Sequence, residues 1–262
     1  MAPVIEPLLQ ELLVLRESVD ANLSGALPEL RGKSYPLGRC REIRDAVYDA
    51  LQSSLEKPVT PGLQALRNYA GQTGGIQKVW GDLRSQYFQN AMYVGDYYID
   101  VANDTVDINK PKIEILPKET SGLRTITDYQ HFAEVARNYW KTDIYSNHVF
   151  GFIAPVLPLI LVYPEGDVQL AVANDHMIQL TRESAFQHSI DALLHFPPAP
   201  DEVAAELLQA SRALTSDLLL PGINALATTT MYQQSQRHLD DHYRDKCVVT
   251  FLQLKQAGTV NL

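Results

Sequence analysis

Apolar side chains recur at helical spacing at the beginning of the chain. From residue 5 to residue 23, leucine, isoleucine and valine follow one another in steps of three and four, with charged residues between them. This period is typical of an amphipathic helix. After a linker rich in turn residues, Ile43, Val47 and Leu51 are again four apart. They predict a second helix from Cys40 to about Leu51, with one face buried.

The pattern then changes from helical spacing to short runs of aromatic and β-branched residues. Two more helices are predicted on either side of the flexible GQTGG segment. A β-hairpin is predicted about Gly95 and Asp96, and the alternating segment KIEIL is expected to pair with it as a third strand. The ranges are 62–69 and 76–83 for the helices, and 88–94, 97–102 and 112–116 for the strands.

The second half of the chain begins with a predicted helix at 127–140. Thr127 and Asp128 can accept hydrogen bonds from its first free amides. Three strands follow, the first two joined by a turn at PEGD, and the remainder is helical, with one helix beginning at Pro200 and Asp201. The ranges are 149–163, 168–172 and 177–180 for the strands, and 181–195, 200–214 and 229–256 for the helices.

Helices at both ends and strands between them favour an α+β fold over a regular alternation of strand and helix. We expect a central, mostly antiparallel sheet with a helical N-terminal segment and a helical C-terminal third. A length of 262 residues is enough for a substantial core. We therefore predict a single α+β domain over residues 1–262, with residues 181–262 as a possible helical C-terminal subdomain.

The charge and the apolar segments exclude several classes of partner. A formal net charge of −9 argues against nucleic acid, whose binding depends on clustered lysine and arginine. The most apolar segment, 149–163, contains two prolines and is shorter than the roughly 20 residues that cross a bilayer. We predict neither a nucleic-acid partner nor a membrane span.

Cysteine usage is typical of a reducing compartment. The two cysteines, Cys40 and Cys247, are too few for a disulfide framework, and the first residues lack the cationic start and apolar run of a signal peptide. A core of this size needs no metal or disulfide for stability. We expect a cytoplasmic protein and no cofactor.

Cys40 lies at the start of the second predicted helix, in the sequence PLGRC. A thiol at a helix N-terminus is close to the positive end of the helix dipole, and Arg39 and Arg41 flank it. Each of these features favours the thiolate, which is the reactive form. The position therefore suits a cysteine nucleophile.

The segment from about residue 35 to residue 107 resembles the papain-like and transglutaminase-like cysteine enzymes. In that family a cysteine opens a helix, a histidine lies on a following strand, and an aspartate or asparagine on the next strand orients the histidine. The resemblance assigns the nucleophile to Cys40 and the orienting acid to Asp100 in YYIDVAND. It implies a thiol-dependent acyl or amide hydrolase or transferase.

The histidine of that arrangement has no counterpart in the predicted hairpin. Where it is expected the sequence reads FQNAMYV, so that Gln89 or Asn90 takes the position. A carboxamide cannot accept a proton from a thiol near neutral pH. An active enzyme would need a base from elsewhere, with His131 and His148 as candidates, whereas a degenerate one would bind its ligand without cleaving it.

An alternative interpretation assigns no chemistry to Cys40. Cys40 precedes Ile43 by three residues and Val47 by seven, so it lies on the buried stripe of its helix, where free cysteine is a small, inert apolar side chain. The protein would then be a binding or accessory protein for a small-molecule or protein ligand. Tyr97 and Tyr98 on the hairpin supply rings that interfaces favour, beside the amides of Gln89 and Asn90.

Two groups of polar residues have spacings that suggest a metal at first sight. His238 and His242 are four apart in RHLDDHYRDKC, so a helix would place both on one face, as in chelating pairs. Four aspartates near the hairpin are three to four apart, unlike the ligands of an EF-hand loop. We predict a solvated helix face for the histidines, a turn supported by Asn103 and Asp104, and no metal site. These aspartates are Asp96, Asp100, Asp104 and Asp107.

Overall fold

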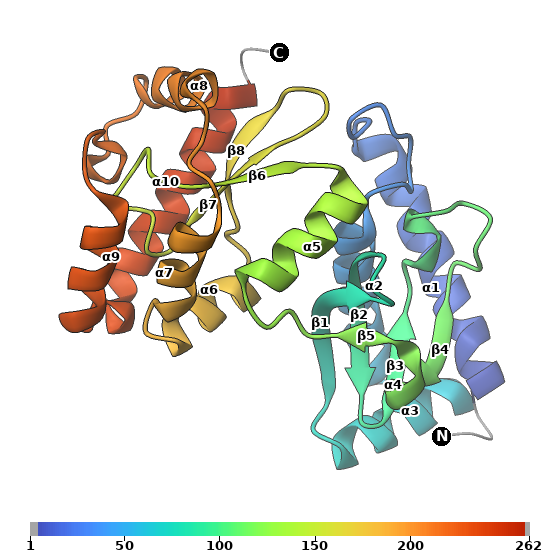
Figure 1. Ribbon diagram of the computed structural model, residues 1–262. Helices are drawn as coiled ribbons and strands as arrows, with labels where there is room; N and C mark the ends of the chain where they lie inside the picture. Colours follow the sequence, from blue (N-terminus) through green and yellow to red (C-terminus); the bar gives the residue numbers. More distant parts are fainter. Residues whose placement is uncertain (1–4, 260–262) are drawn as a thin grey trace. The chain divides into compact units, whose positions relative to one another are not determined.

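The computed structural model describes residues 5–259, and the chain divides into two compact units, Met1–Thr125 and Ile126–Leu262 (Figure 1). Both units combine helices with antiparallel strands, which confirms the predicted α+β class. The strands lie in two sheets, one in each unit. Within residues 5–259, no helix combines the length and the apolar character that crossing a bilayer requires.

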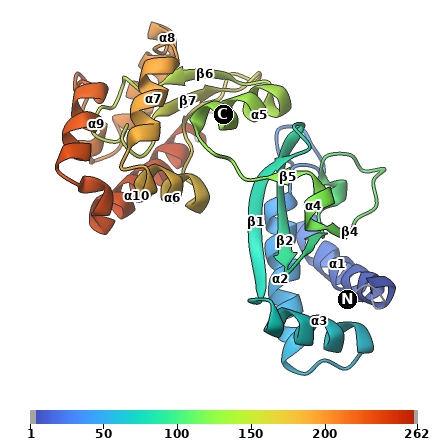
Figure 2. The same cartoon turned by 60° about the horizontal axis from the view of Figure 1, so that its bottom comes forward.

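In the first unit, three helices pack on one face of a five-stranded antiparallel sheet with the order β4-β3-β2-β1-β5 (Figure 2). Met92 pairs with Ile99, which pairs with Ile115. These side chains therefore lie on the same face, where they pack with apolar residues of the helices. The elements are α1 (Ile5–Ala26), α2 (Cys40–Glu56), α3 (Pro61–Gln72), β1 (Ile76–Leu83), β2 (Tyr87–Val94), β3 (Tyr97–Asp100), η2 (Asn103–Thr105), β4 (Glu114–Pro117), α4 (Lys118–Ser121) and β5 (Leu123–Arg124).

The predicted hairpin is confirmed: β2 and β3 pair on either side of Gly95 and Asp96. Gly95 has φ +53°, and a Cβ at this position would lie 2.7 Å from the Tyr69 hydroxyl. A glycine is therefore required in this turn both for its backbone conformation and for the close approach of Tyr69.

In the second unit, a three-stranded antiparallel sheet with the order β6-β7-β8 packs with six helices, as far as residues 126–259 are described. Ile160 of β7 and Leu170 of β8 share a core with helices near the C-terminus. The elements are α5 (Tyr129–Trp140), β6 (Asp143–Ser146), β7 (Leu159–Val162), β8 (Val168–Ala171), α6 (Asp175–Glu183), α7 (Gln187–His195), α8 (Asp201–Ser211), η3 (Asp217–Leu219), α9 (Ala225–Gln234), η4 (Arg237–Leu239) and α10 (Asp241–Thr259).

The division of the chain falls after Thr125, whereas the sequence suggested a possible subdomain from residue 181. Strands β7 and β8 share one apolar core with α8 and α10, because Ile160 and Leu170 belong to the same cluster as Leu207 and Leu254. The strands of the second half thus belong with the C-terminal helices. A single domain over residues 1–262 stays a prediction.

One predicted helix of the first unit is wrong. Residues 76–83 form β1, which pairs with β2 over its whole length, and the Trp80 ring stacks on Phe88 with the centroids 5.1 Å apart. The apolar residues of this segment have helical spacing, yet the backbone bonds to β2 decide its conformation. Pairing with a neighbouring strand outweighs a local period in a segment this short.

Four predictions for the second unit are also corrected. Residues 177–180 are helical, within α6, because the side chain of Asn174 accepts a hydrogen bond from the Met177 amide and caps the helix. Of the strand predicted at 149–163, only Leu159–Val162 is extended. The helices predicted at 181–195 and 229–256 are each interrupted by residues with positive φ, Phe186 in the first and Gln236 in the second.

Candidate functional site

Cys40 is the first residue of α2, as the sequence predicts, and Asn90 of β2 contacts its thiol. The Asn90 Nδ2 donates a hydrogen bond to Cys40 Sγ at 3.3 Å. Met92, which lies on the same face of β2 as Asn90, packs in the core with the helices. The pair therefore lies between the helix and the sheet, and the group that contacts the thiol is an amide donor.

Gln89 and Asp100 form a second pair on neighbouring strands. Gln89 Nε2 donates to Asp100 Oδ2 at 2.7 Å and to the carbonyl oxygen of Ala102 at 3.1 Å. Both side chains are completely buried. Because successive residues of a strand point to opposite faces, Gln89 and Asn90 direct their amides to opposite sides of β2. The thiol and the carboxylate are thus each contacted by a different amide, and neither amide bridges them.

Burial raises the pKa of the Cys40 thiol, and the negative charges of Asp100 and Glu42 raise it further, against the effect of the hydrogen bonds from Asn90. The two arginines next to Cys40 in sequence pair with acidic residues: Arg39 with Glu42 at 2.8 Å and Arg41 with Asp45 at 3.8 Å. The thiolate that the sequence suggested is therefore not favoured at this helix terminus.

Burial also raises the pKa of Asp100 to about 6, despite hydrogen bonds from the Ala102 amide, Gln89 and the Tyr98 hydroxyl. The Tyr98 hydroxyl donates to Asp100 Oδ2 at 3.0 Å, and the Ala102 amide donates to Oδ1 at 2.8 Å. Gln89 Oε1 is buried without a hydrogen-bond partner. Asp100 is fully bonded within the fold and offers no exposed oxygen to a second group.

Neither histidine proposed as a base belongs to the first unit, since all seven histidines of the chain lie after residue 125. His131 lies in the first turn of α5, where its amide donates to the capping carboxylate of Asp128 at 2.8 Å. His148 Nε2 lies 3.3 Å from the carbonyl oxygen of Leu193. Both have local contacts in the second unit, and Cys40 has no imidazole within its own unit.

The two tyrosines proposed to contact a ligand differ in exposure. Tyr98 is fully buried and its hydroxyl is bonded to Asp100, so its side chain presents no surface. Tyr97 is half-buried and its ring meets the edge of Tyr69, with the centroids 5.9 Å apart. Tyr97 is therefore the one of the pair that has surface left for a partner.

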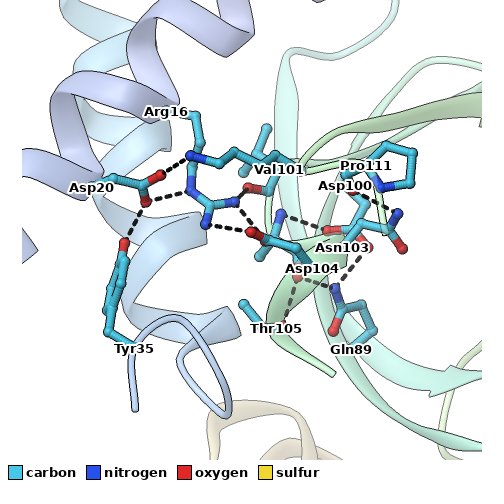
Figure 3. Close-up of polar contacts among 12 residues, drawn as sticks. Arg16, Asp20, Tyr35, Gln89, Asp100, Val101, Asn103, Asp104, Thr105 and Pro111 are labelled. Carbon is cyan, nitrogen blue, oxygen red and sulfur yellow. Dashed lines mark hydrogen bonds and ion pairs between the residues drawn. The ribbon is translucent and has the colours of Figure 1, made fainter. Parts of the chain in front are cut away.

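A buried arginine network holds the end of β3 near this site (Figure 3). Arg16 of α1 is completely buried and makes a two-pronged ion pair with Asp104, with N–O distances of 2.9 and 3.2 Å. It also donates to the Val101 carbonyl oxygen and to Asp20, both at 2.7 Å. Burial alone would raise the pKa of Asp20, but hydrogen bonds from Lys112, Tyr35 and Arg16 lower it.

The sequence contains a signal for this network. Leu8, Leu12, Arg16 and Val19 are spaced three to four apart, so Arg16 occupies a place on the apolar stripe of α1. A charged residue on such a stripe needs a buried partner. The partner is Asp104, which the sequence predicts only to support a turn together with Asn103.

The histidines and aspartates whose spacing suggested a metal do not form a metal site in the described part of the chain. Among the described residues, no group of three or more His, Cys, Asp or Glu side chains is arranged to hold an ion. His238 lies in the short η4 turn and His242 in the exposed first turn of α10, so the predicted common helix face is wrong. Asp100 and Asp104 are bonded to Gln89 and Arg16 respectively.

A surface groove of about 770 Å³ lies in the second unit. Its walls are α6 on one side and η4 with α10 on the other, and we call it the α6–α10 groove. Its apolar lining residues are Ile178, Leu239, Val248 and Val249, and charged residues of both helices surround them. The groove could not be predicted from the sequence, because the short apolar run at 177–180 favours a strand where α6 lies.

Comparisons of the chain with protein-family models, with curated proteins and with solved structures find no match.

Proposed function

We propose that this is a non-catalytic binding or accessory protein, in which Cys40 has a structural role. The observation that carries the proposal is the contact between Cys40 Sγ and the amide of Asn90. An amide group that donates to sulfur cannot also take its proton, so the thiol lacks the general base that a cysteine nucleophile needs. Burial supports the same conclusion, because it raises the thiol pKa and keeps the thiol protonated at neutral pH.

The arrangement of Cys40, Gln89, Asn90 and Asp100 is also the basis for proposing a degenerate relative of papain-like and transglutaminase-like enzymes. In such an enzyme one imidazole contacts both the nucleophile and the orienting acid. In this chain two neighbouring amides on opposite faces of β2 make one contact each. Replacement of the imidazole by either amide would remove proton transfer and keep the packing of the helix on the sheet.

A binding role is supported by the surfaces that each unit offers. Tyr97 leaves part of its ring exposed on the hairpin of the first unit. The α6–α10 groove of the second unit has a volume in the range of roughly 300–1,000 Å³ that ligand sites occupy. A binding protein needs a surface of this kind and no reactive thiol.

The proposal is tested by alkylation of the full-length protein with iodoacetamide at pH 6, with the modified peptide identified by mass spectrometry. We expect Cys40 to react more slowly than the thiol of glutathione, because it is protonated and half-buried. Cys247, which is buried and whose pKa burial raises to about 12, provides an internal slow reference. Reaction of Cys40 faster than glutathione would overturn the proposal in favour of a thiol enzyme.

A further inference from the structure

We propose that the α6–α10 groove binds a cationic amphipathic helix of a partner protein. The inference rests on the proposed binding function and names the class of ligand. It uses none of the residues around Cys40. Four observations support it: the stripes on the two helices, their exposed apolar side chains, the length of the groove and its charge.

Both walls of the groove present residues at helical spacing. On α6 the lining residues Asp175, Ile178 and Arg182 are three and four apart. On α10, Asp245, Val248 and Val249 are likewise three and four apart, and lie on one face. Both helices thus contribute a face to one cavity, as the walls of the site do in helix-in-groove recognition.

Two apolar side chains of the groove are well exposed. Leu239 is 65% exposed and Val249 is 52% exposed. Ile178 is buried and forms the floor of the groove, where it packs on the core. Leu252, 50% exposed, continues the stripe of α10 by one turn. Exposed apolar side chains that line a concave site can pack against the apolar face of a partner.

The length of the groove fits a short helical segment. The lining residues of α6 extend from Asp175 to Glu183, a rise of eight residues, which is about 12 Å at 1.5 Å per residue. A bound helix of two to three turns would cover this distance. It would place apolar residues at i, i+3, i+4 and i+7 against the floor.

The charge of the groove selects a cationic partner. The groove residues together with Asp241 comprise four acids (Asp175, Glu183, Asp241 and Asp245) and two arginines (Arg182 and Arg244), a formal charge of −2. Asp241 contacts both arginines, at 2.7 and 3.0 Å, and Asp245 contacts Arg244 at 2.7 Å. The formal excess is carried by Asp175 and Glu183, which are exposed on α6.

The same charge disfavours the other occupants of an apolar groove. A second copy of this chain would bring a groove of the same sign against the first, and the whole chain carries a formal charge of −9. An anionic membrane surface would likewise be repelled. A helix with lysine or arginine beside its apolar face has the complementary charge.

The test uses fluorescence anisotropy of labelled peptides with the full-length protein. The probe is a peptide of about 14 residues with leucines at i, i+3, i+4 and i+7 and lysines beside them. Its controls are a scrambled peptide and one with glutamate in place of lysine. We expect the lysine peptide to bind at least about tenfold more tightly than either control.

Matched variants separate the groove from general apolar surface. Leu239→Ser with Val249→Ser removes two groove side chains that are 65% and 52% exposed, and Leu194→Ser with Met231→Ser removes two others of the same exposure outside the groove. We expect the groove pair to weaken binding about tenfold and the other pair to leave it unchanged. Equal weakening by both pairs would overturn the proposal.

The charge is tested by Asp175→Lys with Glu183→Lys, compared with Glu202→Lys and Glu206→Lys on α8, which change the net charge equally. The groove variant should prefer the glutamate peptide, and the α8 variant should keep the original preference. A lysine peptide that binds no better than the scrambled one would overturn the proposal. So would self-association in sedimentation that the Leu239 and Val249 substitutions abolish, or binding to phosphatidylserine vesicles.

Failure of this inference and failure of the proposed function give different results. If the peptides do not bind while Cys40 remains unreactive, the cationic helix is rejected and the non-catalytic role stands. If Cys40 alkylates rapidly at pH 6, the non-catalytic role is rejected whatever the peptides do.

Discussion

The two units differ in whether they bury charged side chains. Every buried arginine or aspartate among residues 5–259 lies in the first unit, whereas the buried polar residues of the second unit are hydroxyl and amide side chains. The buried charged residues are Arg16, Arg39, Arg44, Asp82, Asp100 and Asp104. The buried polar residues of the second unit are Thr142, Ser146, Asn147, Thr181, Ser189, Thr228, Thr229 and Thr250.

The difference has consequences for how each unit holds its chain together. In the first unit Arg16 and Asp104 join segments 88 residues apart. In the second unit the hydroxyl of Ser189 donates to the Pro155 carbonyl oxygen, a neutral bond. An ion pair in the interior is costly to break and responds to pH, whereas a neutral hydrogen bond contributes about 1 kcal/mol. The first unit should therefore be the more sensitive to single substitutions and to pH.

The two units can be followed separately, because the chain has one tryptophan in each: Trp80 in β1 and Trp140 in α5. In a Trp140→Phe background the fluorescence reports unfolding of the first unit, and in a Trp80→Phe background it reports the second. Unfolding by guanidinium chloride in these two backgrounds gives the free energy of unfolding of each unit.

The largest effect is expected from Arg16→Met. The substitution leaves the Asp104 carboxylate buried without its cation, so the free energy of unfolding of the first unit should fall by about 3–5 kcal/mol. Glu17→Gln, at the exposed neighbouring position, should change it by less than about 0.5 kcal/mol. Adding Asp104→Leu to Arg16→Met should recover most of the loss, since it removes the orphaned charge. A loss below about 1 kcal/mol in the single variant would mean that the pair contributes no more than a neutral bond.

The next effect is the pH dependence of Asp100. Its pKa is raised from 3.8 to about 6 by burial. Between these values the folded state keeps a proton that the unfolded state has lost, so the free energy of unfolding falls as the pH rises. A shift of about two pKa units corresponds to roughly 3 kcal/mol, fully expressed above about pH 6.5 and absent below about pH 4.

Asp100→Asn puts an amide nitrogen in place of one of the oxygens that accept hydrogen bonds from the Ala102 amide, Gln89 and Tyr98, which costs stability equally at every pH, and it removes this titration. The variant should therefore gain stability relative to the parent as the pH rises from 4 to 7.5, by up to about 3 kcal/mol. Asp49→Asn, at an exposed position of α2, serves as control. A difference between Asp100→Asn and the parent that does not change with pH would contradict the raised pKa.

A smaller effect is expected from Ser189→Ala in the second unit. The substitution removes the 2.7 Å bond to the Pro155 carbonyl oxygen and should lower the free energy of unfolding by about 1–2 kcal/mol, with no dependence on pH. Ser235→Ala, at the exposed end of α9 in the same unit, serves as the surface control. A loss as large as that of Arg16→Met would remove the distinction between the two units.

The sequence predicted the elements of the first unit well where local signals agreed. The amphipathic stripes of α1 and α2 and the hairpin about Gly95 are confirmed. The helix predicted at 76–83 failed because its apolar spacing is helical while its backbone partner, β2, lies beyond it in sequence. The strand prediction at 177–180 is wrong although a local signal was present. A short apolar run fits a strand or a helix equally well, and the helix cap at Asn174 decides for the helix.

The candidate site could be predicted in part. The position of Cys40 at a helix start and the presence of amides where an imidazole is expected were both readable from the sequence. The sequence does not show which of the two amides contacts the thiol, because that contact depends on which face of β2 packs on α2. The answer, Asn90 toward Cys40 and Gln89 toward Asp100, follows from a tertiary contact and from strand alternation.

The most direct test of the central claim is the pH dependence of Cys40 alkylation in the parent protein and in Asn90→His. Alkylation of Cys40 in the parent should reach half its maximal rate above about pH 8.5, the ordinary thiol pKa. Burial raises the pKa of the Cys40 thiol, and the hydrogen bond from the Asn90 amide does not lower it enough to compensate. An imidazole in place of the amide that now lies 3.3 Å from the sulfur should move this midpoint to lower pH. A parent midpoint below pH 7 would contradict the account, because it would show a thiolate that Asn90 and burial should not permit.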